Sequence, residues 1–82
     1  MQLKYWATRD KNTSEDNYIK IYSDFPNVWK DGDDIEYFLL VGVVDLYFLR
    51  QKISTFKKNF GFILEKGECK KVVMEFTLIR KK

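Results

Sequence analysis

The sequence predicts an α+β domain: an antiparallel sheet of four or five strands with one helix packed on one face, in the chain order β-β-(β)-α-β-β. Within residues 43–61, apolar side chains recur at steps of three or four, which lines one side of an α-helix: Leu46, Leu49, Ile53, Phe56 and Phe60. Most other segments alternate between apolar and polar residues, as strands do. A single helix with one apolar stripe has to bury that stripe, and we expect a sheet face to cover it.

The expected helix over residues 43–61 has a well-marked end. Lys57 and Lys58 place positive charge in its last turn, where the helix dipole favours cations. Gly61 follows and can take the left-handed conformation that closes many helices. Gly42 argues against a longer helix that begins near Asp34, because a glycine inside a helix costs about 1 kcal/mol relative to alanine.

Residues 2–23 predict a β-hairpin. The first strand, residues 2–8, alternates, with one set on each face: Leu3, Tyr5 and Ala7 against Lys4, Trp6 and Thr8. Residues 9–16 are polar and rich in turn-forming side chains, so they predict the connecting loop. The second strand, residues 17–23, also alternates, with Ile19 and Ile21 opposite Tyr18, Lys20 and Tyr22.

The middle of the chain contains two breaks and one ambiguous segment. Pro26 interrupts the strand pattern, because proline cannot donate a hydrogen bond to a sheet. Residues 28–30 predict a short extended piece, and the acidic segment 31–34 predicts a turn. The apolar residues 35–41 predict either a third strand, buried on both faces, or the first turns of a longer helix.

The C-terminal part predicts two strands. Residues 62–65 are expected to form a short strand, residues 66–68 a turn and residues 69–80 a long strand. In the long strand, alternate apolar residues are expected on one face: Val72, Met74, Phe76 and Leu78. The 82 residues provide material for one hydrophobic core, so we expect a single domain over residues 1–82.

Cellular setting is indicated by cysteine content and hydropathy. The single cysteine, Cys69, cannot form an internal disulfide, and no secretory-type apolar stretch precedes the first expected strand. The apolar run over residues 35–49 is shorter than the roughly 20 residues that a spanning helix needs, and Glu36 and Asp45 interrupt it. We therefore expect a cytoplasmic protein without a membrane segment.

Charge is divided unevenly along the chain. Residues 1–49 carry five Lys or Arg against nine Asp or Glu, whereas residues 50–82 carry ten against three. Either the two halves attract one another in the folded domain, or the basic C-terminal half forms a face for an anionic partner. The chain has no histidine, which removes the usual general base and the commonest metal ligand. We therefore expect no catalytic residues, metal or cofactor.

Two clusters resemble chemical sites only superficially. Four carboxylates stand close together in the acidic turn, without the spacing of a calcium loop: Asp31, Asp33, Asp34 and Glu36. A solvated turn explains them better. Lys70 and Lys71 follow Cys69 and can activate a thiol, but without histidine an incidental cysteine is the better interpretation.

Two sets of side chains are candidates for binding. Four aromatic residues of the N-terminal hairpin and the segment after it either form an outward face that binds a protein or cap the edge of the core: Trp6, Tyr18, Tyr22 and Trp29. The basic set would bind nucleic acid: Arg50, Lys57, Lys58, Lys70 and Lys71. The sequence contains no RNA-recognition, helix-turn-helix or zinc-finger signature, so the basic set is the alternative.

The opening of the chain, Tyr5-Trp6-Ala7-Thr8-Arg9-Asp10-Lys11, is followed by Ile19-Lys20-Ile21-Tyr22 and Pro26. Over about the first 30 residues it resembles small phage and prophage proteins of gut bacteria, which often begin with a Y-W-x-A-R-D-like strand and a hairpin partner. The loop over residues 11–16 is longer than in that pattern. The resemblance implies a small accessory protein in the cytoplasm of a bacterial or phage-infected cell, with no functional residue to carry over.

Taken together, these observations predict a small non-enzymatic interaction module that binds another protein through a sheet face or edge. A phage-type accessory or inhibitor protein would be one instance. Nucleic-acid binding by the basic half is the alternative, and an enzyme that uses carboxylates and Cys69 is a distant third. The oligomeric state stays open.

Overall fold

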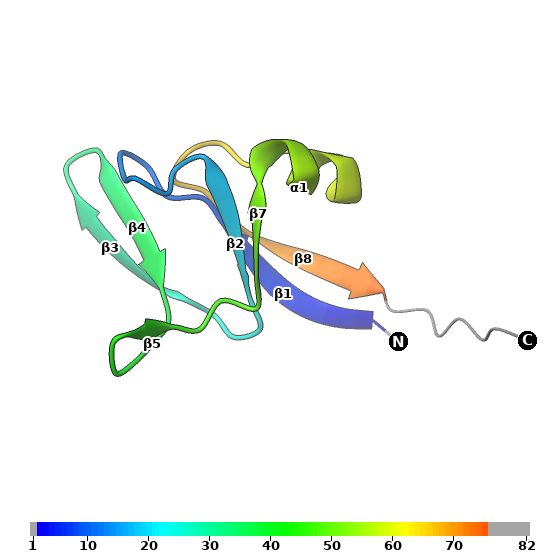
Figure 1. Cartoon of the computed structure of the whole chain (residues 1–82), viewed down its shortest axis with the longest axis horizontal. Helices are drawn as coiled ribbons and strands as arrows, with labels where there is room; N and C mark the ends of the chain where they lie inside the picture. The colour runs from blue at the N-terminus through cyan, green and yellow to red at the C-terminus, as the bar shows by residue number, and fades with distance from the viewer. Residues whose placement is uncertain (1, 76–82) are drawn as a thin grey trace, which may run out of the picture.

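Four strands form one antiparallel sheet in the order β7-β2-β1-β8 in the computed structural model, which describes residues 2–75 (Figure 1). Their bounds are β1 Gln2–Thr8, β2 Tyr18–Tyr22, β7 Leu49–Lys52 and β8 Cys69–Glu75. The sheet and its single packed helix confirm the predicted α+β class. β1 and β2 also confirm the predicted N-terminal hairpin.

The register of the sheet separates its two faces as the alternation predicts. Tyr5 pairs with Val72 across β1 and β8, and Ala7 pairs with Ile21 across β1 and β2. Directly opposed residues point to the same side of an antiparallel sheet, so these four side chains share one face. All four are buried, and with Ile19 they form the sheet side of the core.

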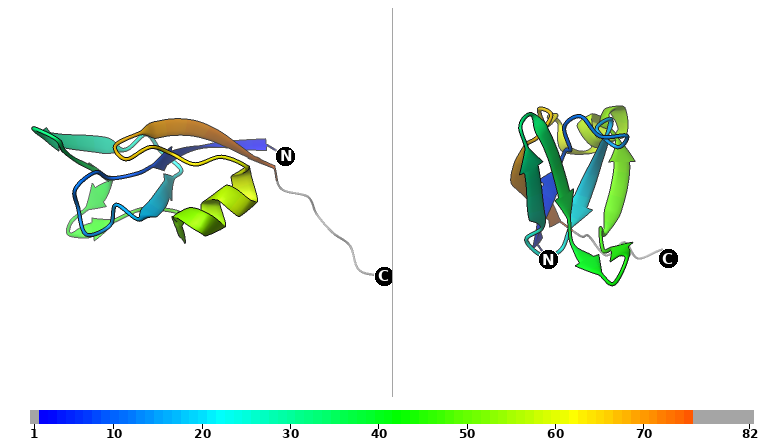
Figure 2. Two further views of the ribbon diagram at one scale, coloured as in Figure 1. Left: turned by 90° about the horizontal axis from the view of Figure 1, so that it is seen from above. Right: turned by 90° about the vertical axis from the view of Figure 1, so that its left-hand side faces the viewer.

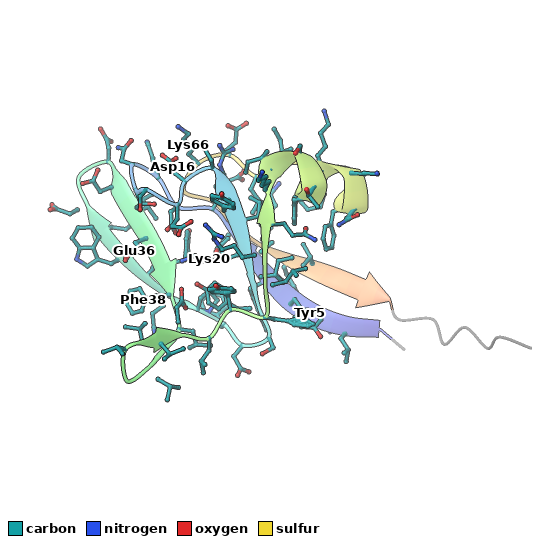
Figure 3. All side chains as sticks on the ribbon, in the orientation of Figure 1. Tyr5, Asp16, Lys20, Glu36, Phe38 and Lys66 are labelled. Carbon is teal, nitrogen blue, oxygen red and sulfur yellow. The ribbon has the colours of Figure 1, made fainter. Side chains whose placement is uncertain are left out.

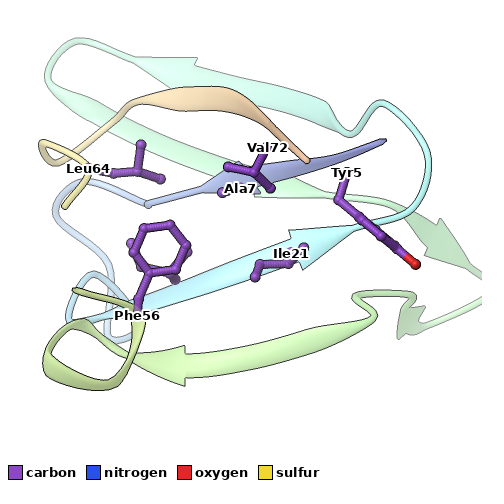
Figure 4. Close-up of a cluster of buried hydrophobic side chains, with 7 residues drawn as sticks. Tyr5, Ala7, Ile21, Phe56, Leu64 and Val72 are labelled. Carbon is purple, nitrogen blue, oxygen red and sulfur yellow. The ribbon is translucent and has the colours of Figure 1, made fainter. Parts of the chain in front are cut away.

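Helix α1, Ile53–Phe60, packs its apolar side on this face. Phe56 is fully buried and stacks on Phe60 at a centroid distance of 4.6 Å, while Phe62 meets it edge-on at 5.3 Å. Leu64, from the segment after the helix, fills the remaining side of the cluster (Figure 4). Packed phenylalanine rings therefore fill the space between the short helix and the sheet.

The helix is much shorter than the predicted 43–61, and this expectation is wrong in its first half. Leu46 lies in a loop, and Leu49 lies in β7 and reaches the core as a strand residue. Although the apolar residues here have helical spacing, residues 49–52 form a strand because β7 pairs with β2. The predicted end is confirmed: Gly61 has a φ of 81° and its N–H donates to the Lys57 carbonyl at 2.8 Å.

Residues 27–45 form two hairpins, which resolves the ambiguity over residues 35–41 in favour of strand. The larger hairpin joins β3, Asn27–Asp31, to β4, Asp34–Phe38, through the predicted acidic turn. The smaller joins β5, Leu40–Val41, to β6, Val44–Asp45. The expected burial on both faces is wrong, since Leu40 and Val41 are exposed.

Two expectations for the C-terminal part differ from the structure or lie beyond it. Residues 62–65 are irregular rather than a strand. They connect α1 to the turn before β8 and bury Leu64 in the core. The turn before β8 is confirmed. The predicted continuation of β8 to Arg80, with Phe76 and Leu78, lies outside the described residues.

The two hairpins lie away from the start of β1 and the end of β8. Figure 2 shows the β3–β4 hairpin at one end of the molecule and the N-terminus at the other. A backbone bridge between Lys11 and Ile35 ties this hairpin to the loop after β1, with N–H to carbonyl distances of 2.8 and 3.0 Å. Within residues 2–75, no helix is both long and apolar enough to cross a bilayer.

Candidate functional site

A buried charge network lies on the face of the sheet opposite the helix. Lys20 on β2 is 8% exposed, and its Nζ donates to the Tyr37 carbonyl at 2.7 Å. The same ammonium lies 3.2 Å from Asp45 Oδ2 and 3.7 Å from Asp10 Oδ2. Figure 3 shows Lys20 between β2 and β4. A buried ammonium needs such partners, because an unpaired charge is costly to remove from water.

The two carboxylates hold backbone segments in place. Asp10 accepts hydrogen bonds from the Tyr37 N–H at 2.9 Å and from the Thr13 hydroxyl at 3.3 Å. Asp45 accepts from the Leu39 N–H at 3.0 Å and from the Tyr22 hydroxyl at 2.9 Å. Lys20, Asp10 and Asp45 thus join β2 to the loop after β1 and to both hairpins.

Sequence reasoning missed this network, although a weak signal was present. Lys20 stands between two isoleucines in a strand, and Asp45 stands inside an apolar run. A lone charge among apolar residues indicates a buried partner of opposite sign. The pairing itself was out of reach, since Lys20 and Asp45 are 25 residues apart.

Tyr22 belongs to this network, and its expected place in an outward aromatic face is wrong. Its side chain is fully buried, and its hydroxyl bonds Asp45 and the Tyr37 carbonyl. The phenol pKa is raised, mainly by burial and further by the hydrogen bond to Asp45. Tyr22 is therefore a structural residue that keeps its proton at alkaline pH where an exposed tyrosine loses it.

This raised pKa predicts alkaline sensitivity. Above the ordinary tyrosine pKa of 10.0, the unfolded chain releases the phenol proton while the folded chain keeps it, so stability falls as pH rises. Tyr22→Phe should make the free energy of unfolding fall less steeply above pH 10, by up to about 1.4 kcal/mol per pH unit. Urea unfolding at a series of pH values measures this. Equal slopes for wild type and variant would contradict the assignment.

A cavity of about 630 Å³, open to solvent, adjoins the network. Its walls come from the loop after β1, from β2 and from the two hairpins: Asp10, Thr13, Ser14, Glu15, Lys20, Trp29, Glu36, Tyr37, Phe38, Leu40 and Asp45. Carboxylates and apolar side chains predominate among them. Trp29 is 50% exposed, so its indole is open to a ligand.

An exposed apolar surface begins at the same place. The segment 40–48, here called the apolar loop, contains the β5–β6 hairpin and the chain that leads into β7. Its exposed apolar residues are Leu40, Val41, Val43, Val44, Leu46, Tyr47 and Phe48. Val43 is 97% exposed, at a two-residue turn in which Gly42 supplies a φ of 63°. Exposed apolar side chains clustered in one short segment are typical of an interaction site.

The other predicted aromatic residues do not form one face. Trp6 is half-buried and packs edge-on against Phe25 at 5.8 Å. Tyr18 lies under the Arg50 guanidinium, 3.7 Å from the ring centroid. Of the predicted set, Trp29 alone lines the cavity, so it is the member that the structure places at the candidate site.

The predicted basic residues are spread over the molecule. Arg50 on β7 is bound to Glu15, with Nη2 to Oε2 at 2.6 Å. Lys57 and Lys58 are exposed on α1, whereas Lys70 and Lys71 lie on β8, the opposite edge of the sheet from β7. The Arg50–Glu15 pair and the Lys66–Asp16 pair, at 3.6 Å, join the acidic half of the chain to the basic half. Part of the charge asymmetry therefore serves the fold.

Cys69 lies at the start of β8 and is partly buried. Partial burial raises the pKa of the Cys69 thiol, which leaves less thiolate at neutral pH. Over residues 2–75, the structure contains no group of three His, Cys, Asp or Glu residues arranged to hold a metal ion. Asp31 ends β3 and is exposed, and it lies opposite Asp34, the partly buried first residue of β4.

Comparison with protein-family models, curated proteins and solved structures finds no match to this chain. The hydrogen-bonding groups of the charge network bind loop and hairpin backbone and one another. The surfaces accessible to a ligand are the cavity wall and the apolar loop.

Proposed function

We propose that this chain is a small non-enzymatic module that binds a partner protein through the apolar loop, residues 40–48. The observation that carries the proposal is that seven of the nine residues from Leu40 to Phe48 are exposed apolar residues, interrupted only by Gly42 and Asp45. Burying such side chains in an interface is worth about 25 cal/mol per Å² of apolar surface removed from water.

Backbone hydrogen bonds and a ring contact anchor the base of the apolar loop, which favours binding. The Leu46 N–H donates to the Leu39 carbonyl at 2.8 Å, and the Phe48 N–H donates to the Ile21 carbonyl at 2.7 Å. Phe48 also packs against Tyr5 at a centroid distance of 5.1 Å. A surface that is already ordered loses less conformational entropy on binding, so more of the contact energy appears as affinity.

The resemblance of the first residues to phage and prophage proteins suggests where such a module would act. In that case it would be an accessory or inhibitor protein that binds its target in the cytoplasm of a bacterial or phage-infected cell. The apolar loop would supply the contact surface in that setting. This narrower role is part of the proposal.

Nucleic-acid binding remains the alternative, and the placement of the basic residues gives it less support. Arg50 and Lys70 already have carboxylate partners, and two strands separate β7 from β8. Anisotropy of labelled DNA and RNA over a salt series separates the two functions. An affinity whose logarithm falls linearly with the logarithm of the salt concentration would favour nucleic-acid binding. No binding at low salt would favour protein binding.

The proposal predicts that Val43→Ser with Val44→Ser weakens binding of a purified partner at least tenfold, because two apolar side chains leave the interface, at about 1 kcal/mol each. Both valines are more than half exposed, so folding should be unchanged. The partner is first captured by affinity purification, and its affinity is then measured by calorimetry.

The matched control is Val73→Ser on β8, where the valine is 52% exposed outside the apolar loop. This variant should bind the partner like the wild type. Equal affinity of the Val43→Ser, Val44→Ser variant and the wild type would overturn the proposal. Circular dichroism of each variant confirms that the fold is intact.

A further inference from the structure

The cavity beside the apolar loop carries excess negative charge. Four carboxylates line it against one ammonium: Asp10, Glu15, Glu36 and Asp45 against Lys20. Arg50 binds Glu15 from outside the lining, so an excess of two negative charges remains when this cation is counted. Lys20 is already bonded to the Tyr37 carbonyl and to Asp45, and it is not free to neutralise a further carboxylate.

Glu36 is the carboxylate that is accessible to a ligand. It is exposed, and its side chain has neither an ion pair nor a hydrogen bond to the part of the chain that the structure describes. Trp29 pairs directly with Glu36 across β3 and β4, so the indole and the carboxylate project from the same side of the hairpin. Phe38, two residues further along β4, projects from that side as well.

The Glu36 carboxylate and the apolar wall of the cavity together suit one kind of ligand. An arginine or lysine side chain has an apolar stem that packs against rings and aliphatic groups, and a charged head that pairs with a carboxylate. Trp29, Phe38 and Leu40 would contact the stem, and Glu36 would pair with the head. The volume of about 630 Å³ has room for such a side chain.

We infer that this cavity receives an arginine or lysine side chain of the protein partner, whose neighbouring apolar residues pack on the apolar loop. Leu40 and Asp45 line the cavity and also belong to the β5–β6 hairpin, so one segment of partner chain can reach both surfaces. The inference rests on the proposed function and adds the chemistry of the partner: a basic residue flanked by apolar ones.

The test uses two synthetic peptides as probes. One is acetyl-Leu-Val-Arg-Val-Leu-amide, and the other has citrulline in place of arginine, which keeps the shape and removes the charge. Each is titrated into the full ¹⁵N-labelled chain to millimolar concentration while two-dimensional NMR follows the Trp29 indole N–H, Glu36 and the apolar loop. The arginine peptide should shift all three sets of signals with at least fivefold tighter binding than the citrulline peptide.

Two variants separate pocket binding from general charge attraction. Glu36→Gln should reduce the preference for arginine about fivefold, whereas Asp33→Asn, an exposed residue in the turn of the same hairpin, should leave it unchanged. Both substitutions remove one negative charge, so they change the net charge equally. Equal loss of preference in both variants would overturn a specific site.

The outcomes distinguish this inference from the proposed function. If both peptides shift the apolar loop alike and leave Trp29 and Glu36 unmoved, the cavity inference fails and the proposed function stands. If the arginine peptide shifts Trp29 and Glu36 but not Val43 and Val44, which belong to the apolar loop and lie outside the cavity lining, the cavity binds cations without the loop, and the proposed function fails. Shifts at neither surface would overturn the inference.

Discussion

Replacing Lys20 with methionine is expected to destabilise the folded domain by about 3–5 kcal/mol, the usual cost of removing one partner from a buried ion pair. The substitution keeps the length and apolar stem of the side chain but leaves Asp10, whose side chain is 2% exposed, without its cation. Asp45 and the Tyr37 carbonyl lose a donor as well. Urea unfolding at pH 7, followed by tryptophan fluorescence, measures the loss.

A matched control for this variant is Lys30→Met. Lys30 is exposed on β3 and forms no ion pair with the described residues, so its replacement should change stability by less than about 0.5 kcal/mol. Because small domains have only about 5–15 kcal/mol of stability in total, Lys20→Met should remove a large share of it. Two variants of equal stability would show that the network is not a main support of the hairpins.

The second large effect is expected for Phe56→Ala, which should cost about 3–5 kcal/mol. Phe56 is the one fully buried residue of α1, and its ring stacks on Phe60 and meets Phe62 edge-on. Truncation leaves a cavity between the helix and the sheet, where Ile19 and Ile21 would lose contacts. Thermal unfolding followed by circular dichroism would report the change.

Phe25→Ala is the control for the loss of an aromatic ring. Phe25 is 69% exposed and touches Trp6 edge-on, so its removal should cost about 1 kcal/mol or less. The ratio between the two variants tests whether stability depends on the core under α1. Similar losses for Phe56→Ala and Phe25→Ala would contradict this account of the core.

The sequence predicted well those parts of the fold that depend on local rules. The hairpin of β1 and β2 follows from strict alternation on each side of a polar loop. The end of α1 follows from Gly61, which takes the left-handed conformation required there. In both cases, residues close together in the sequence determine the structure.

The apolar loop was mispredicted because hydrophobic periodicity carries no information about what covers a surface. Leu46 and Leu49 have helical spacing relative to Ile53, yet one is exposed in a loop and the other is in a strand. Residues 40–48 are as apolar as a core segment but lie outside the core. A sequence pattern cannot separate side chains that the chain buries itself from those that a partner would bury.

The candidate site was predicted only in part, for a related reason. Trp29 was among the expected binding residues and does line the cavity. The sequence pattern places Glu36 in a solvated acidic turn, whereas its position beside Trp29 depends on the pairing of β3 with β4. Tyr22 alternates like a surface residue, but it is buried because two hairpins cover the second face of the sheet.

The most direct test of the proposed interface is site-specific photo-crosslinking. A benzophenone amino acid replaces Val43 in the apolar loop or, as the matched control, Val73 on β8, and each protein is irradiated in extract of its source organism. We expect a discrete crosslinked protein at position 43 that is absent at position 73 and is lost on competition with unlabelled wild-type chain. The same faint set of products at both positions, unchanged by competition, would contradict binding through residues 40–48.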